Sequence, residues 1–126
     1  MEEHSEEEKG MITLRTEVEF DSAHYLEGYD GFCSRMHGHT WRIILLVKGH
    51  KSLMNDIGIL WDFTNLKKIA NEYDHYILNN KMSCNPTAEN IAITVYDKLK
   101  NENSTLKYRV RVYESKKSFA ELGDEI

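Results

Sequence analysis

Residues 11–21 read MITLRTEVEFD, and this stretch decides the fold class because apolar and polar side chains alternate along it. Successive side chains of a β-strand point to opposite faces of the sheet, so alternation is typical of a strand with one buried face. The apolar face carries Ile12, Leu14, Val18 and Phe20, together with the methyl group of Thr16. We therefore predict a strand with one face on a core and the other face open.

The chain beyond this strand contains further periodic segments. Residues 41–47 (WRIILLV) form an apolar run typical of a strand covered on both faces. Apolar residues recur at helical spacing over 62–73 and again over 88–100. Pro86 suits the start of the second helix, where a missing N–H costs nothing. Residues 106–112 alternate again and predict a last strand or hairpin.

The order of these elements indicates an α+β fold. Strands and helices that are segregated along a sequence favour an antiparallel sheet with both helices on one face. Such a sheet keeps an open second face and two unpaired edges. We therefore expect the protein to associate with copies of itself.

Length and composition favour one domain. A chain of 126 residues with 40% hydrophobic content can bury a single core. Residues 1–10 (MEEHSEEEKG) contain five glutamates and one lysine, and so supply -4 of the formal net charge of -5. A stretch this acidic and poor in apolar residues cannot offset its ordering entropy. We predict a disordered acidic tail over 1–10 and one domain over 11–126.

Several classes of protein are disfavoured. No segment approaches the roughly 20 apolar residues that span a bilayer, and the N-terminus lacks a signal pattern, so we expect a cytoplasmic protein without a membrane partner. Cys33 and Cys84 are expected to be reduced thiols. The sequence lacks a stripe of basic residues with interleaved aromatic residues, so we do not expect it to bind nucleic acid.

Residues 33–41 (CSRMHGHTW) carry the densest group of reactive side chains. His37 and His39 lie two apart at the entrance to a strand, so their rings point to the same side. His24 ends the first strand, and strand alternation places its side chain on the same face as the apolar residues of that strand. Three inward histidines would form a zinc site with an open fourth position, as in catalytic zinc centres. The alternative is that a His-x-His pair is incidental.

Cys33 has three interpretations. As a fourth ligand it would close the zinc site and make it structural. As a free thiol beside a cation it would be a base or nucleophile. It could also be a small buried residue, and spacing alone does not separate the three.

Two acidic positions are further candidates. Asp74 and His75 end a helix before an Asn-rich loop, where an imidazole can face a cleft while carboxylates set its tautomer; a surface histidine is the alternative. Glu114 continues the apolar parity of the last strand. A carboxylate there needs paired donors, such as two neighbouring N–H groups of a guanine-like ring, unless the strand frays and leaves it solvated.

Taken together, the motifs of the chain resemble the 6-pyruvoyl-tetrahydropterin synthase family. They run in the family's order from the first strand almost to the end: FDSAHYL (20–26), CSRMHGHTW (33–41), GILWDF (58–63), YDHYILN (73–79), NPTAEN (85–90) and VYES (112–115). The resemblance implies a tunnelling fold (T-fold), a four-stranded antiparallel sheet with two helices on one face. It also implies a homo-oligomer, either a trimer or two stacked trimers, with active sites between subunits.

The resemblance assigns a role to each candidate residue. It implies that Zn²⁺ is bound by His24, His37 and His39. It implies catalytic roles for Cys33, Asp74 and His75. It implies that the pterin ring is bound by Glu114, with help from Thr87.

The gap of three residues between Cys33 and His37 resembles the 6-carboxytetrahydropterin synthases of 7-deazaguanine (queuosine or archaeosine) biosynthesis. The implied activity is a lyase that converts 7,8-dihydroneopterin triphosphate to 6-carboxytetrahydropterin, acetaldehyde and triphosphate. One alternative is a 6-pyruvoyl-tetrahydropterin synthase, which eliminates triphosphate without cleaving the carbon chain. Another is a zinc-stabilised pterin-binding module without catalysis. Relatives with aldolase activity carry glutamate in place of the cysteine.

The chain departs from the family pattern at two places. The stretch 62–74 is about one helical turn shorter than in typical members. Tyr73 stands where leucine is usual before the Asp-His pair, and Cys84 matches no residue with a family role.

Overall fold

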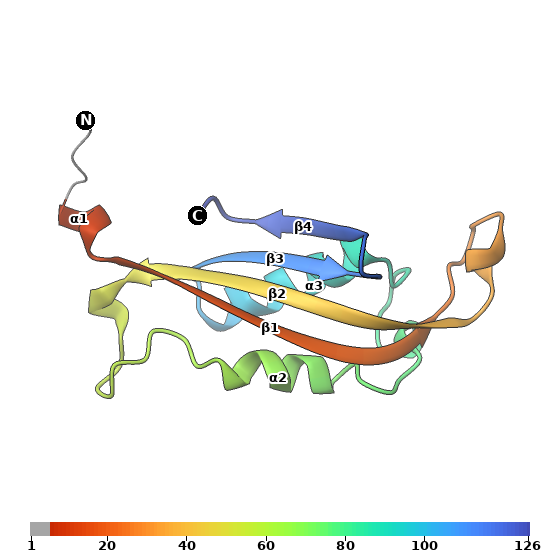
Figure 1. Cartoon of the computed structure of the whole chain (residues 1–126), viewed down its shortest axis with the longest axis horizontal. Coiled ribbons are helices and arrows are strands. Elements are labelled where there is room, and N and C mark those ends of the chain that lie inside the picture. Colours follow the sequence, from red (N-terminus) through yellow and green to blue (C-terminus); the bar gives the residue numbers. More distant parts are fainter. Residues whose placement is uncertain (1–5) are drawn as a thin grey trace.

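The computed structural model describes residues 6–126, and within them four strands form one antiparallel sheet in the order β1-β2-β3-β4 (Figure 1). The strands are β1 (Met11–His24), β2 (His37–His50), β3 (Lys107–Tyr113) and β4 (Phe119–Gly123). The main helices are α2 (Thr64–Asn71) and α3 (Ala88–Glu102). Shorter helical turns are α1 (Glu6–Lys9), η1 (Phe32–Ser34), η2 (Lys51–Leu53) and η3 (Leu78–Asn80). The predicted α+β fold is therefore confirmed.

The strand register places the apolar side chains of three strands on the face that the helices cover. Phe20 of β1 pairs with Trp41 of β2, and Ile43 pairs with both Val18 and Val112 of the flanking strands. The buried faces of α2 and α3 join these side chains in one core. The alternation predicted for 11–21 thus gives one buried face, as expected.

The opposite face of the sheet is not covered by the described elements. Ile44 and Leu46 of β2 lie on this face between charged residues of the neighbouring strands. Arg109 and Arg111 of β3 both contact Glu121 of β4, with N–O distances of 3.0 and 2.8 Å. A mixed apolar and charged surface of this kind suits contact with another chain.

The first main helix is shorter than the predicted 62–73. Asp62 accepts hydrogen bonds from the backbone N–H and the hydroxyl of Thr64, and α2 starts there. After Asn71 the chain turns, and Tyr73 packs its ring 5.9 Å from Phe20 in the core. The tyrosine is therefore a core residue that ends the helix against β1. It also fixes the direction in which the next residues leave the core.

Strand β2 starts earlier than the predicted run of 41–47. It includes His37 to Thr40, which pair with the last residues of β1. This pairing is long-range, and the polar residues involved carry no local strand signal. Its effect is to set the two histidines of the HGH motif on a rigid element.

The predicted acidic tail is only partly within the described residues. Residues 1–5 lie outside them, and their predicted disorder stays a prediction. Residues Glu6–Lys9 form one helical turn. The following Gly10 is fixed to the end of β2, since its carbonyl accepts a hydrogen bond of 2.8 Å from the Lys51 N–H.

Two expectations from composition can be compared with the structure. Cys33 and Cys84 are both free thiols, as expected. None of the helices described within residues 6–126 has the length and apolar character needed to cross a bilayer.

Candidate functional site

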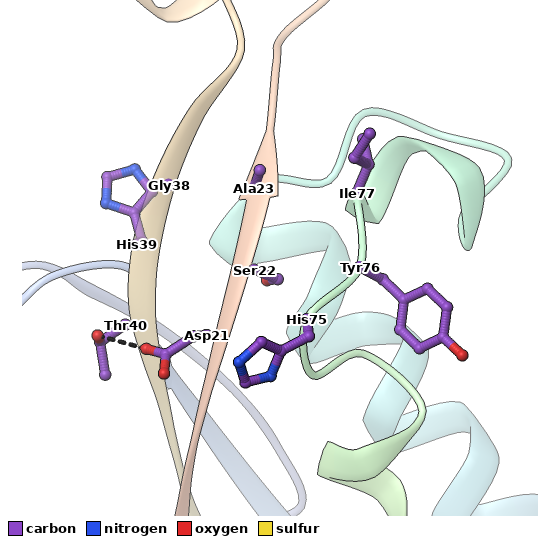
Figure 2. Close-up of a pocket in the computed structure, with 9 residues that line it drawn as sticks. All are labelled: Asp21, Ser22, Ala23, Gly38, His39, Thr40, His75, Tyr76 and Ile77. Carbon is purple, nitrogen blue, oxygen red and sulfur yellow. Dashed lines mark hydrogen bonds between the residues drawn. The ribbon is translucent and has the colours of Figure 1, made fainter.

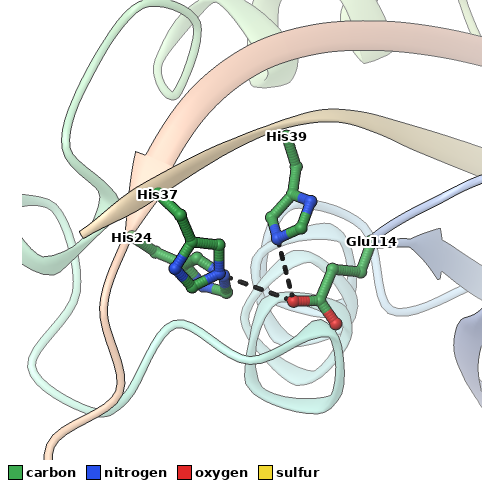
Figure 3. Close-up of side chains that lie close together, drawn as sticks. All are labelled: His24, His37, His39 and Glu114. Atoms are coloured by element: carbon green, nitrogen blue, oxygen red, sulfur yellow. Dashed lines mark hydrogen bonds and ion pairs between the residues drawn. The ribbon is translucent and has the colours of Figure 1, made fainter. Parts of the chain in front are cut away.

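The adjoining ends of β1 and β2 bring three histidines together (Figure 3). His24 is paired with His37 in the strand register, and His39 follows two residues later on the same face. The ring centroids lie 4.5 to 5.1 Å apart. His24 is 1% exposed, so the group is built around a buried ring. The predicted convergence of the three side chains is present.

Backbone carbonyls fix the tautomers of two of these rings. His24 Nδ1 lies 2.8 Å from the Pro86 carbonyl oxygen, and His37 Nδ1 lies 2.7 Å from that of Arg35. A carbonyl can only accept, so each Nδ1 must carry the proton and each neutral Nε2 exposes a lone pair. The two Nε2 atoms nevertheless lie 2.9 Å apart. Two facing lone pairs require a cation between them, either a proton or a metal ion.

His39 completes the group with a nitrogen that lacks a hydrogen bond. Its Nε2 is buried and has no hydrogen-bond partner among the described residues. Burial lowers the pKa of His39 despite the opposing charge of Glu114, and the neighbouring His24 and His37 lower it further. The neutral ring, which is the form that binds metals, is therefore favoured.

Glu114 supplies a carboxylate to the same group. Its Oε1 atom lies 3.3 Å from His24 Nε2 and 3.2 Å from His39 Nε2. The residue follows β3, where its N–H donates to the Ser118 carbonyl in the turn to β4. The carboxylate thus lies on the same face as the histidines, as the alternation of residues 106–112 predicted, and it is not free in solvent.

These residues fit a metal ion. One ligand atom from each of His24, His37, His39 and Glu114 lies within 4.8 Å of the others. Two nitrogens that share an ion at about 2.0–2.1 Å lie at most about 4.2 Å apart, and the His24–His37 pair meets this limit. Carbonyl contacts to the opposite ring nitrogens are the usual outer support of metal-binding histidines. The donor set is therefore three histidine nitrogens and one carboxylate oxygen, which suits a divalent metal ion.

Cys33 lies outside this group of ligand atoms. It sits in the short turn η1, half-buried, and its carbonyl accepts a hydrogen bond from the Leu26 N–H. The thiol is not one of the atoms that converge within 4.8 Å. Of the three interpretations from sequence, the fourth-ligand one has no support in this geometry.

Asp74 and His75 lie at a different position, against the outer edge of β1. Asp74 Oδ2 is 3.0 Å from His75 Nδ1, and Asp74 Oδ1 accepts a hydrogen bond of 2.9 Å from the Asp21 N–H. Hydrogen bonds from that N–H and from the His75 ring lower the pKa of Asp74, so the carboxylate stays charged. The imidazole is 79% exposed in the single chain. The pair has the arrangement of an oriented, solvent-accessible base.

A pocket of about 580 Å³ lies beside His75, and Figure 2 shows the residues that line it. His39 lines it from β2 and His75 lines it from the segment beside β1. Ser22 also lines it, with a buried hydroxyl that has no hydrogen-bond partner among the described residues. Because the Ser22 hydroxyl and His39 Nε2 are both buried, the pocket exposes the His75 ring rather than these two groups.

Thr87 occupies a structural position. Its hydroxyl accepts a hydrogen bond of 3.1 Å from the Asn90 N–H and so caps the start of α3. The preceding residue, Pro86, is the one that contacts His24. A role for Thr87 in binding a ligand stays a prediction.

The groups that support the candidate side chains were not predictable from side-chain patterns. The carbonyls of Pro86 and Arg35 carry no side-chain signal, although both lie inside recognisable motifs. Asp21 was counted only as a polar position of β1, yet it contacts the Asp-His pair. Its place in FDSAH, three residues before a predicted ligand, was the one available sign.

Comparisons with known proteins agree on one family. The sequence profile described as "6-pyruvoyl tetrahydropterin synthase" matches residues 13–125. The 6-carboxy-5,6,7,8-tetrahydropterin synthase of Synechocystis is 33% identical over 113 residues, which cover 83% of this chain and 88% of that protein. The Haemophilus influenzae protein of the same name is 30% identical over 139 residues, covering 88% and 98%. The Caenorhabditis elegans 6-pyruvoyl tetrahydropterin synthase structure superposes with a TM-score of 0.71 at 24% identity, covering 91% of this chain and 96% of that one.

Proposed function

The chain belongs to the 6-pyruvoyl tetrahydropterin synthase family, a family of enzymes, and from this premise we propose a reaction for it. The proposed enzyme is a zinc-dependent 6-carboxytetrahydropterin synthase of 7-deazaguanine biosynthesis. It would convert 7,8-dihydroneopterin triphosphate and water to 6-carboxy-5,6,7,8-tetrahydropterin, acetaldehyde and triphosphate. The equation balances without an external oxidant, because the pterin ring is reduced while the first side-chain carbon is oxidised.

The observation that carries this proposal is the open group of three histidine nitrogens. Two Nε2 lone pairs face each other at 2.9 Å, and a third Nε2 is buried without a hydrogen bond. The names of the relatives and the three-residue gap between Cys33 and His37 support the carboxy product over the pyruvoyl product.

We propose zinc as the ion, held by His24, His37 and His39. When bound, it supplies a Lewis acid that polarises the side-chain oxygens of the substrate. The nitrogen ligands suit zinc, and a three-histidine set leaves a position for substrate. The carbonyls of Pro86 and Arg35 keep two of the rings in the required tautomer.

Glu114 is proposed to bind the pterin ring. Its carboxylate has two oxygens, and only Oε1 contacts the histidines. A carboxylate at the edge of the site can accept from two neighbouring N–H groups of the ring. This contact would orient the substrate side chain toward the three histidines. Thr87, at the start of α3, is the proposed second contact to the ring.

Cys33 and His75 are proposed to move the protons of the reaction. Cys33, as a thiolate, would take a proton from the substrate side chain. His75, with Nδ1 held by Asp74, presents Nε2 as the second proton acceptor or donor. Each such transfer contributes on the order of 10²–10⁴-fold to the rate.

We also propose that the enzyme works as a homo-oligomer in the cytoplasm, as a trimer or a pair of trimers. The sheet face that carries Ile44 and Leu46 has no cover within the described chain. The His75 ring is 79% exposed in the single chain, although a proton-transfer group works best in a site shielded from water. A second subunit would cover both surfaces.

Product identification tests the proposed reaction. Purified protein is incubated with 7,8-dihydroneopterin triphosphate, and both acetaldehyde and the pterin product are measured. Acetaldehyde with 6-carboxytetrahydropterin supports the proposal. A pyruvoyl product without acetaldehyde favours the alternative synthase, and absence of turnover in a zinc-loaded sample favours a binding module.

A further inference from the structure

The segment that carries His75 is attached to the outer edge of β1 by backbone hydrogen bonds. The His75 N–H donates to the Asp21 carbonyl at 2.6 Å, and the Ala23 N–H donates to the Tyr76 carbonyl at 3.1 Å. Ala23 and Ile77 form a parallel bridge one step further. The edge strand therefore acts as a fixed support for the histidine.

His75 itself adopts a backbone conformation that non-glycine residues rarely populate. Its φ angle is +61°, in the left-handed region, where the side chain crowds the backbone. Such a conformation persists only where the surroundings hold it, and it is frequent at functional sites. Here the contacts with Asp21 and Ala23 hold it.

A second carboxylate, that of Asp21, lies beside the His75 ring (Figure 2). One oxygen of Asp21, one oxygen of Asp74 and one ring nitrogen of His75 all lie within 4.8 Å of one another. Asp21 Oδ1 accepts a hydrogen bond of 2.6 Å from the hydroxyl of Thr40, on the neighbouring strand. The Asp21 carboxylate is thus held in place from β2 while it faces the histidine.

We propose that Asp21, oriented by Thr40, is a positioning residue for His75. This inference rests on the proposed proton-transfer role of His75. Asp74 fixes the tautomer through Nδ1, and the charge of Asp21 stabilises the ring when it has taken up a proton. The other titratable groups that line the pocket within the described residues are His39 and Tyr76.

The backbone and side-chain contributions of Asp21 can be separated by substitution. The backbone N–H of residue 21 donates to Asp74 and its carbonyl accepts from the His75 N–H, whatever the side chain is. Asp21→Asn therefore keeps the hydrogen bonds that attach the His75 segment to β1. Only the negative charge is removed. Thr40→Val removes the orienting hydroxyl with little change in shape, and Thr40→Ser retains it.

The test is steady-state kinetics of the zinc-loaded, full-length protein with 7,8-dihydroneopterin triphosphate. We expect Asp21→Asn and Thr40→Val each to lower kcat by roughly 10-fold, with KM, metal content and Tm unchanged. Thr40→Ser should recover most of the loss. Thr13→Val, the same change at an exposed position of β1, serves as the matched control and should have no effect.

A double variant separates positioning from a general structural role. If Asp21 acts through His75, adding Asp21→Asn to His75→Ala causes no further loss. An equal loss in both backgrounds would overturn the inference, as would normal kcat in Asp21→Asn. If turnover by His75→Ala is too slow to measure, the kcat of Thr40→Val is the deciding measurement. A wild-type kcat in Thr40→Val contradicts the inference. Full turnover by His75→Ala would instead overturn the proposed role of His75.

Discussion

His24 Nε2 and His37 Nε2 lie 2.9 Å apart, although the Nδ1 atom of each ring faces a backbone carbonyl. Neutral rings held in this way present lone pairs to each other, which is unfavourable without a cation. The arrangement therefore favours a cation between the two rings, and the strands that carry them are the most extensively paired part of the sheet.

Removal of one ring should abolish metal binding. We expect His37→Ala to lose bound zinc, because two remaining nitrogens cannot hold the ion at the required affinity. Zinc content per chain after gel filtration measures this. His50→Ala, at the far end of β2, is the control and should keep the metal. Equal zinc in both variants would contradict the assigned ligands.

Substitution of Cys33 should separate catalysis from metal binding. Cys33→Ala is expected to keep zinc and substrate affinity while kcat falls by about 10²–10⁴-fold, since one proton-transfer group is lost. Turnover and zinc content are measured on the same preparation. Loss of zinc would show that the thiol is a ligand, and unchanged turnover would show that it is not a catalytic group.

Glu114 lies close enough to the histidines for two roles, and Glu114→Gln distinguishes them. If the carboxylate binds the pterin ring, the variant keeps zinc and its KM rises about 10-fold or more, because a charge-assisted pair of hydrogen bonds is weakened. Zinc affinity by competition with a chelator is the second measurement. A large fall in zinc affinity at constant KM would assign Glu114 to the metal instead.

Acid should weaken the attachment of the last strand through Asp124. Burial raises the pKa of this carboxyl, but hydrogen bonds from Lys100, Tyr96 and the Tyr108 N–H outweigh it and lower the pKa from 3.8 to about 2. A lowered folded-state pKa means that the stabilisation is complete above about pH 4–5 and is lost as the pH falls through 2.

We therefore expect Asp124→Asn to lower the free energy of unfolding by about 1–2 kcal/mol at pH 7, a value reduced for solvent screening because the side chain is 24% exposed. The difference from wild type should shrink toward zero near pH 2. Denaturant titrations at both pH values measure it. Asp56→Asn, in an exposed loop, is the control. A difference that does not change with pH would exclude the ionic contribution.

Periodicity predicted the parts of the fold that depend on local alternation. The parity of 11–21 placed His24 on the buried side, and the parity of 106–112 placed Glu114 beside it, because a regular strand carries side-chain direction over its full length. The HGH motif then supplied the remaining rings. Most of the candidate metal centre was therefore predictable from residue spacing.

Long-range docking could not be predicted in this way. Asp21 and Asp74 are 53 positions apart, and their contact arises because the turn after α2 lies against the edge of β1. No periodic pattern describes such a contact. For the same reason the strand character of His37 to Thr40 was missed, since it depends on pairing with β1 rather than on propensity.

The most direct test of the account is a zinc titration of metal-depleted protein, with bound zinc and acetaldehyde production measured on each sample. We expect no acetaldehyde without metal, and a rise in proportion to bound zinc that reaches its maximum at one ion per chain. Acetaldehyde production at full rate in samples without zinc, or none in fully loaded samples, would contradict it.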